Sequence, residues 1–216
     1  MKTSMIESFA LFQHIQETEL EHVLQNLQAY TKSYEKGDFI LYTGDYAPSM
    51  GIVLSGNVSV VQRDVWGKEN IFHQIHEGGM FAETYAYLEH EPLMVDVIAN
   101  CKSEILFLNI RALWELPMNK TNASLMKNLT HILAQKNLHL SRKIEHITPR
   151  TIRERVFSYL QDQSIKQNTT HLHISFDRQQ LADYLCVERS ALSHELSKLQ
   201  KEGKIKLEKH FIDLII

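Results

Sequence analysis

Cysteine is scarce in this 216-residue chain, which contains only Cys101 and Cys186. Two distant cysteines exclude a four-cysteine iron-sulfur cluster and a disulfide framework. No uncharged apolar run reaches the roughly 18 residues that a transmembrane helix needs, and Met1–Gln13 lacks the pattern of a secretory signal. These absences predict a cytoplasmic protein without a membrane partner.

Glycine and proline are also few, and their distribution divides the chain. Six of the eight glycines occupy turn positions between Gly37 and Gly79, among short apolar or alternating runs that are typical of antiparallel strands. From Asn119 to Ile147 neither residue occurs, and apolar side chains recur at helical spacing. We therefore predict an α+β fold with an N-terminal jelly-roll, a double-stranded β-helix (residues 1–115), a long helix (116–148) and a C-terminal winged helix-turn-helix (149–216).

The chain has no large excess of either charge, and its net charge is −3. The balance differs along the chain: residues 150–216 carry eleven Lys and Arg against nine Asp and Glu, a net +2, whereas residues 1–149 carry −5. Association with a polyanion depends on the local potential of the contacting face. The composition is thus compatible with DNA binding by the C-terminal part, without showing it.

The long helical segment has an apolar stripe with a seven-residue repeat. Such a stripe buries against a partner helix, which predicts a homodimer, although packing against the protein's own β-domain is an alternative. The predicted dimer interface consists of Met126, Leu129, Leu133, Leu140, Ile144 and Ile147.

The segment from Asp177 to Gln200 has the spacing of a helix-turn-helix. Asp177 is a candidate cap for a first helix, and Cys186 stands at the turn where a glycine is usual. The alternating runs at Ile205–Leu207 and Phe211–Leu214 predict a terminal hairpin, or wing. Together these features predict a DNA-binding unit.

The start of the second helix would face a DNA groove. Arg189 can pair with guanine, whereas lysines and Arg178 suit backbone phosphates. The alternative is that these are ordinary solvated polar residues. The predicted DNA-binding residues are Arg178, Arg189, Ser190, Ser193, His194, Lys198 and Lys209.

Four segments carry a family resemblance: Lys36–Ile40, Leu54–Val58, Glu77–Glu83 and Arg178–Leu185. In these segments and in the order of its parts, the chain resembles the family of the cAMP receptor protein and the fumarate and nitrate reduction regulator. The resemblance implies a transcription regulator rather than an enzyme. It also implies a homodimer joined by the long helix, a small effector in the β-domain, double-stranded DNA as partner, and RNA polymerase as a further partner.

The resemblance also bears on the effector. Glu83 matches the acidic residue that cyclic-nucleotide-binding members use on the ribose, but Leu93-Met94 replaces the Arg-Ser pair that holds the cyclic phosphate. An apolar pair cannot neutralise a buried anion, so we do not expect cAMP. The sequence instead predicts an unidentified effector that is more apolar than a cyclic nucleotide. The alternatives are that Glu83 only caps a helix and that the apolar residues only form core. The predicted pocket consists of Phe81, Glu83, Tyr85, Met94, Leu133 and Leu140.

Two departures at the second helix change the expected operator. Arg189 matches a base-contacting arginine of the family, but Ser190 stands where many members have glutamate and His194 where they have arginine. The operator should therefore differ from the commonest family site.

His73 and His76 raise the possibility of a metal site, because jelly-rolls of the cupin type hold metals. Residues three apart on a regular strand point to opposite faces, so this pair would not converge, and we predict no metal site. Glu83 has no second acid or nucleophile beside it in the sequence to support catalysis. The competing hypothesis is a cupin-like metal-binding or ligand-binding protein without DNA binding.

Overall fold

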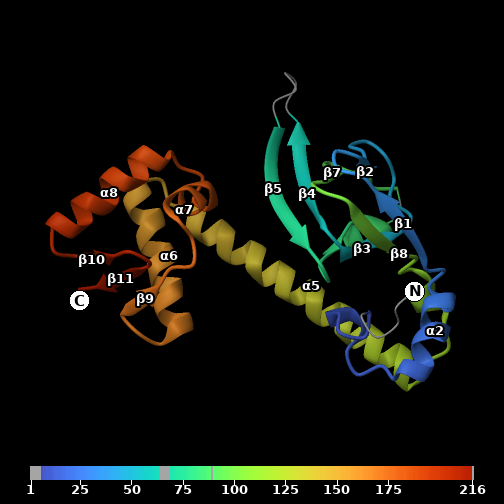
Figure 1. Cartoon of the computed structure of the whole chain (residues 1–216). Coiled ribbons are helices and arrows are strands. Elements are labelled where there is room, and N and C mark those ends of the chain that lie inside the picture. Colours follow the sequence, from blue (N-terminus) through green and yellow to red (C-terminus); the bar gives the residue numbers. More distant parts are fainter. Residues whose placement is uncertain (1–5, 64–68, 89, 216) are drawn as a thin grey trace. The chain divides into compact units, whose positions relative to one another are not determined.

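The computed structural model describes residues 6–63, 69–88 and 90–215. The chain falls into two compact units, one ending at Ile132 and the other beginning at Leu133 (Figure 1). The division lies within helix α5 (Lys120–Ile147). The bounds of α5 confirm the predicted long helix. The three-part division at residues 115 and 148 stays a prediction.

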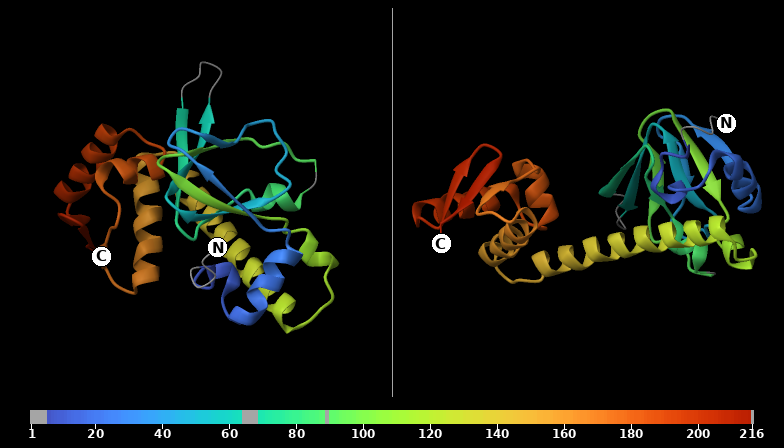
Figure 2. Two further views of the ribbon diagram at one scale, coloured as in Figure 1. Left: turned by 45° about the vertical axis from the view of Figure 1, so that its right-hand side comes forward. Right: turned by 90° about the horizontal axis from the view of Figure 1, so that it is seen from below.

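The N-terminal unit is built on two four-stranded antiparallel sheets (Figures 1 and 2). In the first sheet the strands follow the order β1 (Tyr30–Tyr34), β8 (Ser103–Leu108), β3 (Met50–Ser55), β6 (Met80–Phe81). In the second the order is β2 (Phe39–Leu41), β7 (Asp96–Ala99), β4 (Asn57–Arg63), β5 (Glu69–His76).

The first sheet is buried on both faces, and the alternation of side chains explains how. On β3, Val53 points into the core between the two sheets, whereas Ile52 and Leu54 belong to a second core on the opposite face. Gly51 allows a close approach, since a Cβ placed there would lie 2.2 Å from the ring of Phe81. The strand is therefore a continuous apolar run.

Helices cover the outer face of the first sheet. They are η1 (Ala10–Phe12), α2 (Glu17–Asn26), α3 (Glu83–Tyr87), α4 (Ala112–Glu115) and the beginning of α5. Leu125 and Leu129 of α5 are buried in this second core. Asn128 Nδ2 donates hydrogen bonds to the carbonyl oxygens of Leu11 and Gln13, at 3.0 and 2.8 Å. The first turns of α5 are thus part of the N-terminal unit.

The C-terminal unit contains the end of α5 and a winged helix-turn-helix. Its helices are α6 (Ile152–Gln167), α7 (Arg178–Tyr184) and α8 (Arg189–Lys201), and its sheet has the order β10 (Ile205–Glu208), β11 (Phe211–Leu214), β9 (His171–His173). The predicted wing is β10 and β11. Strand β9 was not predicted; Gln167 covers its edge, hydrogen-bonding to both the N–H and the carbonyl of His173 at 2.9 and 3.0 Å.

The predicted fold class is confirmed, from the double β-sheet domain through the long helix to the winged helix-turn-helix. Within the described ranges, no helix is both long and apolar enough to cross a membrane.

Candidate nucleic-acid interface and effector site

The two helices of the helix-turn-helix are shaped by local signals. Asp177 caps α7: it accepts a hydrogen bond from Gln180 N at 2.8 Å, while the Gln180 side chain accepts one from Asp177 N at 2.9 Å. In the turn that follows, Cys186 has a φ of +54°, the left-handed conformation that favours glycine. The predicted cap and the predicted glycine-like role of Cys186 are both confirmed.

Helix α8 divides into a buried and an exposed side. Leu192, Leu196 and Leu199 are at most 1% exposed and pack into the core of the C-terminal unit. The predicted contact residues that belong to α8 lie on the other side, where Ser193 is half-buried and Arg189, Ser190, His194 and Lys198 are exposed. We call Arg189, Ser190, Ser193 and His194 the recognition face.

The beginning of α8 is poorly arranged for the helix itself. Glu188 at the N-cap makes no side-chain capping hydrogen bond, and the first helical residue is the cation Arg189. A positive charge at a helix N-terminus opposes the helix dipole. These two features destabilise the isolated helix, but both favour the binding of an external anion at this end.

Basic residues also gather where α7 begins beside the wing. Arg178, Lys209 and His210 line a surface hollow of about 170 Å³, together with Asp177 and Phe176. Burial lowers the pKa of Arg178, whose side chain is half-buried, whereas Lys209 is exposed in the wing turn. The structure thus brings the predicted residues Arg178 and Lys209 to one hollow, and Lys198 lies further along α8.

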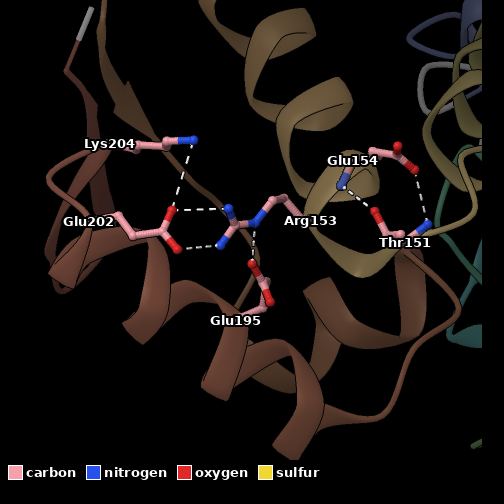
Figure 3. Close-up of polar contacts among 6 residues, drawn as sticks. All are labelled: Thr151, Arg153, Glu154, Glu195, Glu202 and Lys204. Carbon is pink, nitrogen blue, oxygen red and sulfur yellow. Dashed lines mark hydrogen bonds and ion pairs between the residues drawn. The ribbon is translucent and has the colours of Figure 1, made fainter.

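An arginine that the sequence did not single out connects α6 to α8 (Figure 3). Arg153 makes a bidentate contact with Glu202, with N–O distances of 2.7 and 3.0 Å, and its Nε donates to Glu195 at 2.6 Å. These hydrogen bonds raise the pKa of Arg153 and lower that of Glu202. We call Arg153, Glu195 and Glu202 the α6–α8 clamp.

A second arginine holds the turn of the helix-turn-helix. Arg155 donates to the carbonyl oxygens of Leu185 and Cys186, at 3.0 and 3.1 Å, and to that of Pro149 at 2.8 Å. Its three acceptors are backbone groups, so no side-chain pattern in the sequence indicates them. The turn that precedes the recognition face is thereby tied to the beginning of α6.

The predicted dimer stripe has two kinds of surroundings. Leu129 is 4% exposed and Met126 packs beside it on the core of the N-terminal unit, as the alternative of packing on the β-domain expected. Leu133, Leu140 and Ile144 are 38%, 58% and 60% exposed, and Ile147 is half-buried. Only the later part of the stripe leaves large apolar side chains uncovered.

The predicted effector residues also differ in their surroundings. Phe81 is in the core between the two sheets, edge-on to Phe107, and is 3% exposed. Glu83 is half-buried in the first turn of α3, Tyr85 is half-buried further along α3, and Met94 is 68% exposed. Leu133 and Leu140 belong to the C-terminal unit.

The position expected to hold a cyclic phosphate carries no cation. The side chain of Leu93 is 2% exposed, and its backbone hydrogen-bonds to Asp45 and Gly44 at 2.8 Å. Met94 presents a thioether to solvent. These residues do not fit a cyclic phosphate, because neither can pair with a negative charge.

A surface hollow of about 230 Å³ lies beside α3. Tyr85 is the only residue of the predicted pocket among those that line it; the others include Tyr46, Pro48, Leu88 and Arg111. This hollow is a second candidate for the effector site.

The histidines of β5 do not form part of a recognisable metal cluster. His73 pairs in register with Val60 and His76 with Asn57, and both side chains are exposed. In the part of the chain that the structure describes, no three His, Cys, Asp or Glu residues gather as metal ligands would.

Comparisons with known proteins agree with this architecture. Residues 31–120 match the profile of the cyclic nucleotide-binding domain, and residues 154–215 match that of the Crp-like helix-turn-helix domain. A search of curated protein sequences found no match.

Solved structures of similar fold come from several bacteria. The catabolite activator protein of Thermus thermophilus is 20% identical, with a TM-score of 0.50, and the match covers 95% of this chain and 93% of that one. DNR of Pseudomonas aeruginosa is 21% identical, with a TM-score of 0.50, and the match covers 99% of this chain and 93% of that one. The c-di-GMP-responsive regulator CLP of Xanthomonas campestris is 19% identical, with a TM-score of 0.56, and the match covers 93% of this chain and 100% of that one. With a cyclic nucleotide-binding domain followed by a Crp-like helix-turn-helix, the chain belongs to the Crp/Fnr family of transcription regulators.

Proposed function

We propose that this protein binds a specific DNA operator as a homodimer, through the recognition face of α8, under the control of a small effector other than cAMP. The observation that carries the proposal is the exposed N-terminal end of α8. Its arginine and its uncapped N-terminus disfavour the isolated helix, yet both suit a groove lined by phosphates.

In this proposal the contacts divide by role. Arg189 reads base edges, with Ser190, Ser193 and His194 beside it. Arg178 at the beginning of α7, Lys198 on α8 and Lys209 in the wing contact backbone phosphates. Two such units, related by the dimer axis, would read half-sites about 34–36 Å apart, one turn of DNA.

A pair of substitutions tests these roles on an operator selected from random DNA by the purified protein. Arg189→Ala should cost about 1–3 kcal/mol of binding free energy on the selected operator and relax the preference at one base position. Lys209→Ala should weaken binding to all sequences about equally and reduce the salt dependence. Fluorescence anisotropy at two salt concentrations measures both effects.

Lys32→Ala is the matched control for loss of a surface charge, because Lys32 is an exposed lysine in the N-terminal unit. Unchanged affinity and unchanged base preference in both Arg189→Ala and Lys209→Ala would contradict the assignment of the recognition face.

The effector of the proposal is a small organic molecule. The absence of a cation at Leu93 and Met94 argues against cAMP, and solved structures of the same fold include a regulator described as responsive to c-di-GMP, so the fold does not dictate the ligand. Titration calorimetry with cAMP should show no saturable binding. Binding at micromolar cAMP would contradict the proposal, whereas a thermal-shift screen of metabolites identifies the true ligand class.

The DNA-bound dimer would then contact RNA polymerase, as the family resemblance implies. Run-off transcription from a template that carries the selected operator measures whether the bound protein changes polymerase activity.

A further inference from the structure

His146 is the one buried histidine among the twelve of this chain. It lies in the last turn of α5 and is 1% exposed, whereas the other eleven are exposed. A buried imidazole between helices requires an explanation, because histidine is the side chain that changes charge near neutral pH.

The ring of His146 joins α5 to the first helix of the helix-turn-helix. Its Nδ1 lies 2.9 Å from the hydroxyl oxygen of Tyr184, on α7. The ring also packs against the rings of Tyr159 on α6 and Tyr184, with centroids 5.6 and 5.8 Å away, and Phe176 stacks against Tyr159. Three helices therefore meet at one imidazole. We call His146, Tyr159 and Tyr184 the joint.

The other ring nitrogen lies near a carboxylate but does not form a hydrogen bond with it. Nε2 of His146 is 3.6 Å from Oδ2 of Asp162 on α6, too long for a hydrogen bond, and it has no hydrogen-bond partner within the described residues. Charged groups surround the joint from each element. They are Arg142, Lys143 and Glu145 on α5, and Asp162 and Lys166 on α6, while α7 contributes the neutral phenol of Tyr184.

Burial lowers the pKa of His146, and the attraction of Asp162 opposes this only in part. Burial also raises the pKa of Tyr184, and that of Tyr159 to about 12, so both phenols stay protonated near neutral pH. A protonated imidazole donates from both nitrogens, so it would require the Tyr184 hydroxyl to act as acceptor. The neutral ring is the form that this packing favours.

We propose that neutral His146 is a positioning residue that fixes the helix-turn-helix to the end of α5, and that its protonation in mildly acid solution loosens this joint and weakens operator binding. The proposal rests on the proposed function, since it assumes that α8 reads DNA. The exposed leucine and isoleucine stripe of the dimer proposal ends on the same turns of α5. Loosening the joint would thus blur the spacing of two recognition helices.

The sign of the effect follows from linkage. The docked joint binds fewer protons than the released one, so docking is fully favourable above about pH 6.5 and weakens as the pH falls toward the lowered pKa of His146. Each unit by which docking lowers that pKa allows up to about a tenfold loss of operator affinity for each subunit of the dimer.

Operator affinity should be measured by fluorescence anisotropy between about pH 5 and pH 8, at constant ionic strength, with the wild type, His146→Gln and His131→Gln. The wild type should lose affinity below about pH 6.5 relative to His146→Gln, which cannot be protonated. His131, exposed on the same helix, provides the matched control, and its variant should keep the wild-type profile. An identical pH profile for wild type and His146→Gln would overturn the proposal.

Asp162→Asn gives a second readout that a merely structural role would not produce. Without the carboxylate the docked imidazole is harder to protonate, so the loss of affinity in acid should become larger. If His146→Gln fails to fold, this variant still decides, because a smaller or unchanged loss contradicts the proposal.

The titration of the His146 ring by NMR tests the joint without DNA. Its midpoint should lie below about pH 6.5, and the signals of Tyr184 should move with it. A midpoint at or above that value sinks the proposal. Failure of the wild type to bind any operator at pH 8, with this titration as expected, would instead count against the proposed function.

Discussion

Cys186 adopts the left-handed backbone conformation between the two helices of the helix-turn-helix, with a φ of +54°. For a residue with a Cβ this conformation is strained by roughly 1 kcal/mol relative to glycine. Arg155 binds the Cys186 carbonyl oxygen, a backbone group that any residue at this position would supply.

We therefore expect Cys186→Gly to raise the free energy of unfolding by about 1 kcal/mol, measured by urea denaturation. Cys186→Ala is the matched variant: it also removes the thiol but keeps the Cβ, so it should gain little. Equal stabilisation in the two variants would show that the thiol, rather than the backbone, is responsible.

Residue-level roles were predictable where the signal is local. The cap at Asp177 and the glycine-like turn at Cys186 depend on neighbours within a few residues, and both were predicted from the sequence. The contact of Gly51 with Phe81 was not, because it joins two strands that are thirty residues apart.

At the scale of elements, the α6–α8 clamp is the clearest addition of the structure. Helices α7 and α8 were predicted from the spacing of the helix-turn-helix, but Arg153 on α6 meets its partners 42 and 49 residues further along the chain. A pattern with a period of 3.6 residues carries no information on such pairs. Strand β9 escaped for another reason, since three residues are too few to show alternation.

The clamp has a predictable pH dependence. Arg153 lowers the pKa of Glu202, so the contribution of the clamp to stability is fully present above about pH 4.5 and is lost as the pH falls through the lowered value. Arg153→Gln should reduce stability at neutral pH, and the difference from wild type should shrink in acid. Urea unfolding midpoints at about pH 7 and pH 3 measure it.

Lys201→Gln removes an exposed charge from the last turn of α8, the helix that Arg153 binds, and serves as the control. A deficit in Arg153→Gln that is equally large at both pH values would mean that the arginine stabilises the unit by packing and not by its ion pairs.

At the scale of the whole molecule, the exposed part of the α5 stripe predicts the assembly. Leu140 and Ile144 are more than half exposed in a single chain, an arrangement that a partner helix would relieve. Ile144→Glu should place a charge in that interface, giving a monomer by analytical ultracentrifugation and a loss of operator affinity of at least about tenfold.

Ile165→Glu is the matched control, because Ile165 is 73% exposed and belongs to α6, a helix that does not carry the stripe. It should remain a dimer with wild-type affinity. A dimer that survives both Ile144→Glu and Leu140→Glu would mean that another surface joins the subunits.

The sequence by itself determined the order of the three parts, the fold class and the helix-turn-helix with its exposed recognition face, because periodicity, capping and turn residues act over a few positions. Only the tertiary structure decided that Leu129 is core, that Phe81 lies between the sheets, that Arg153 clamps α8, and that His146 alone among the histidines is buried. Those outcomes depend on which distant segments pack together, and packing places side chains by shape and burial that no short pattern contains.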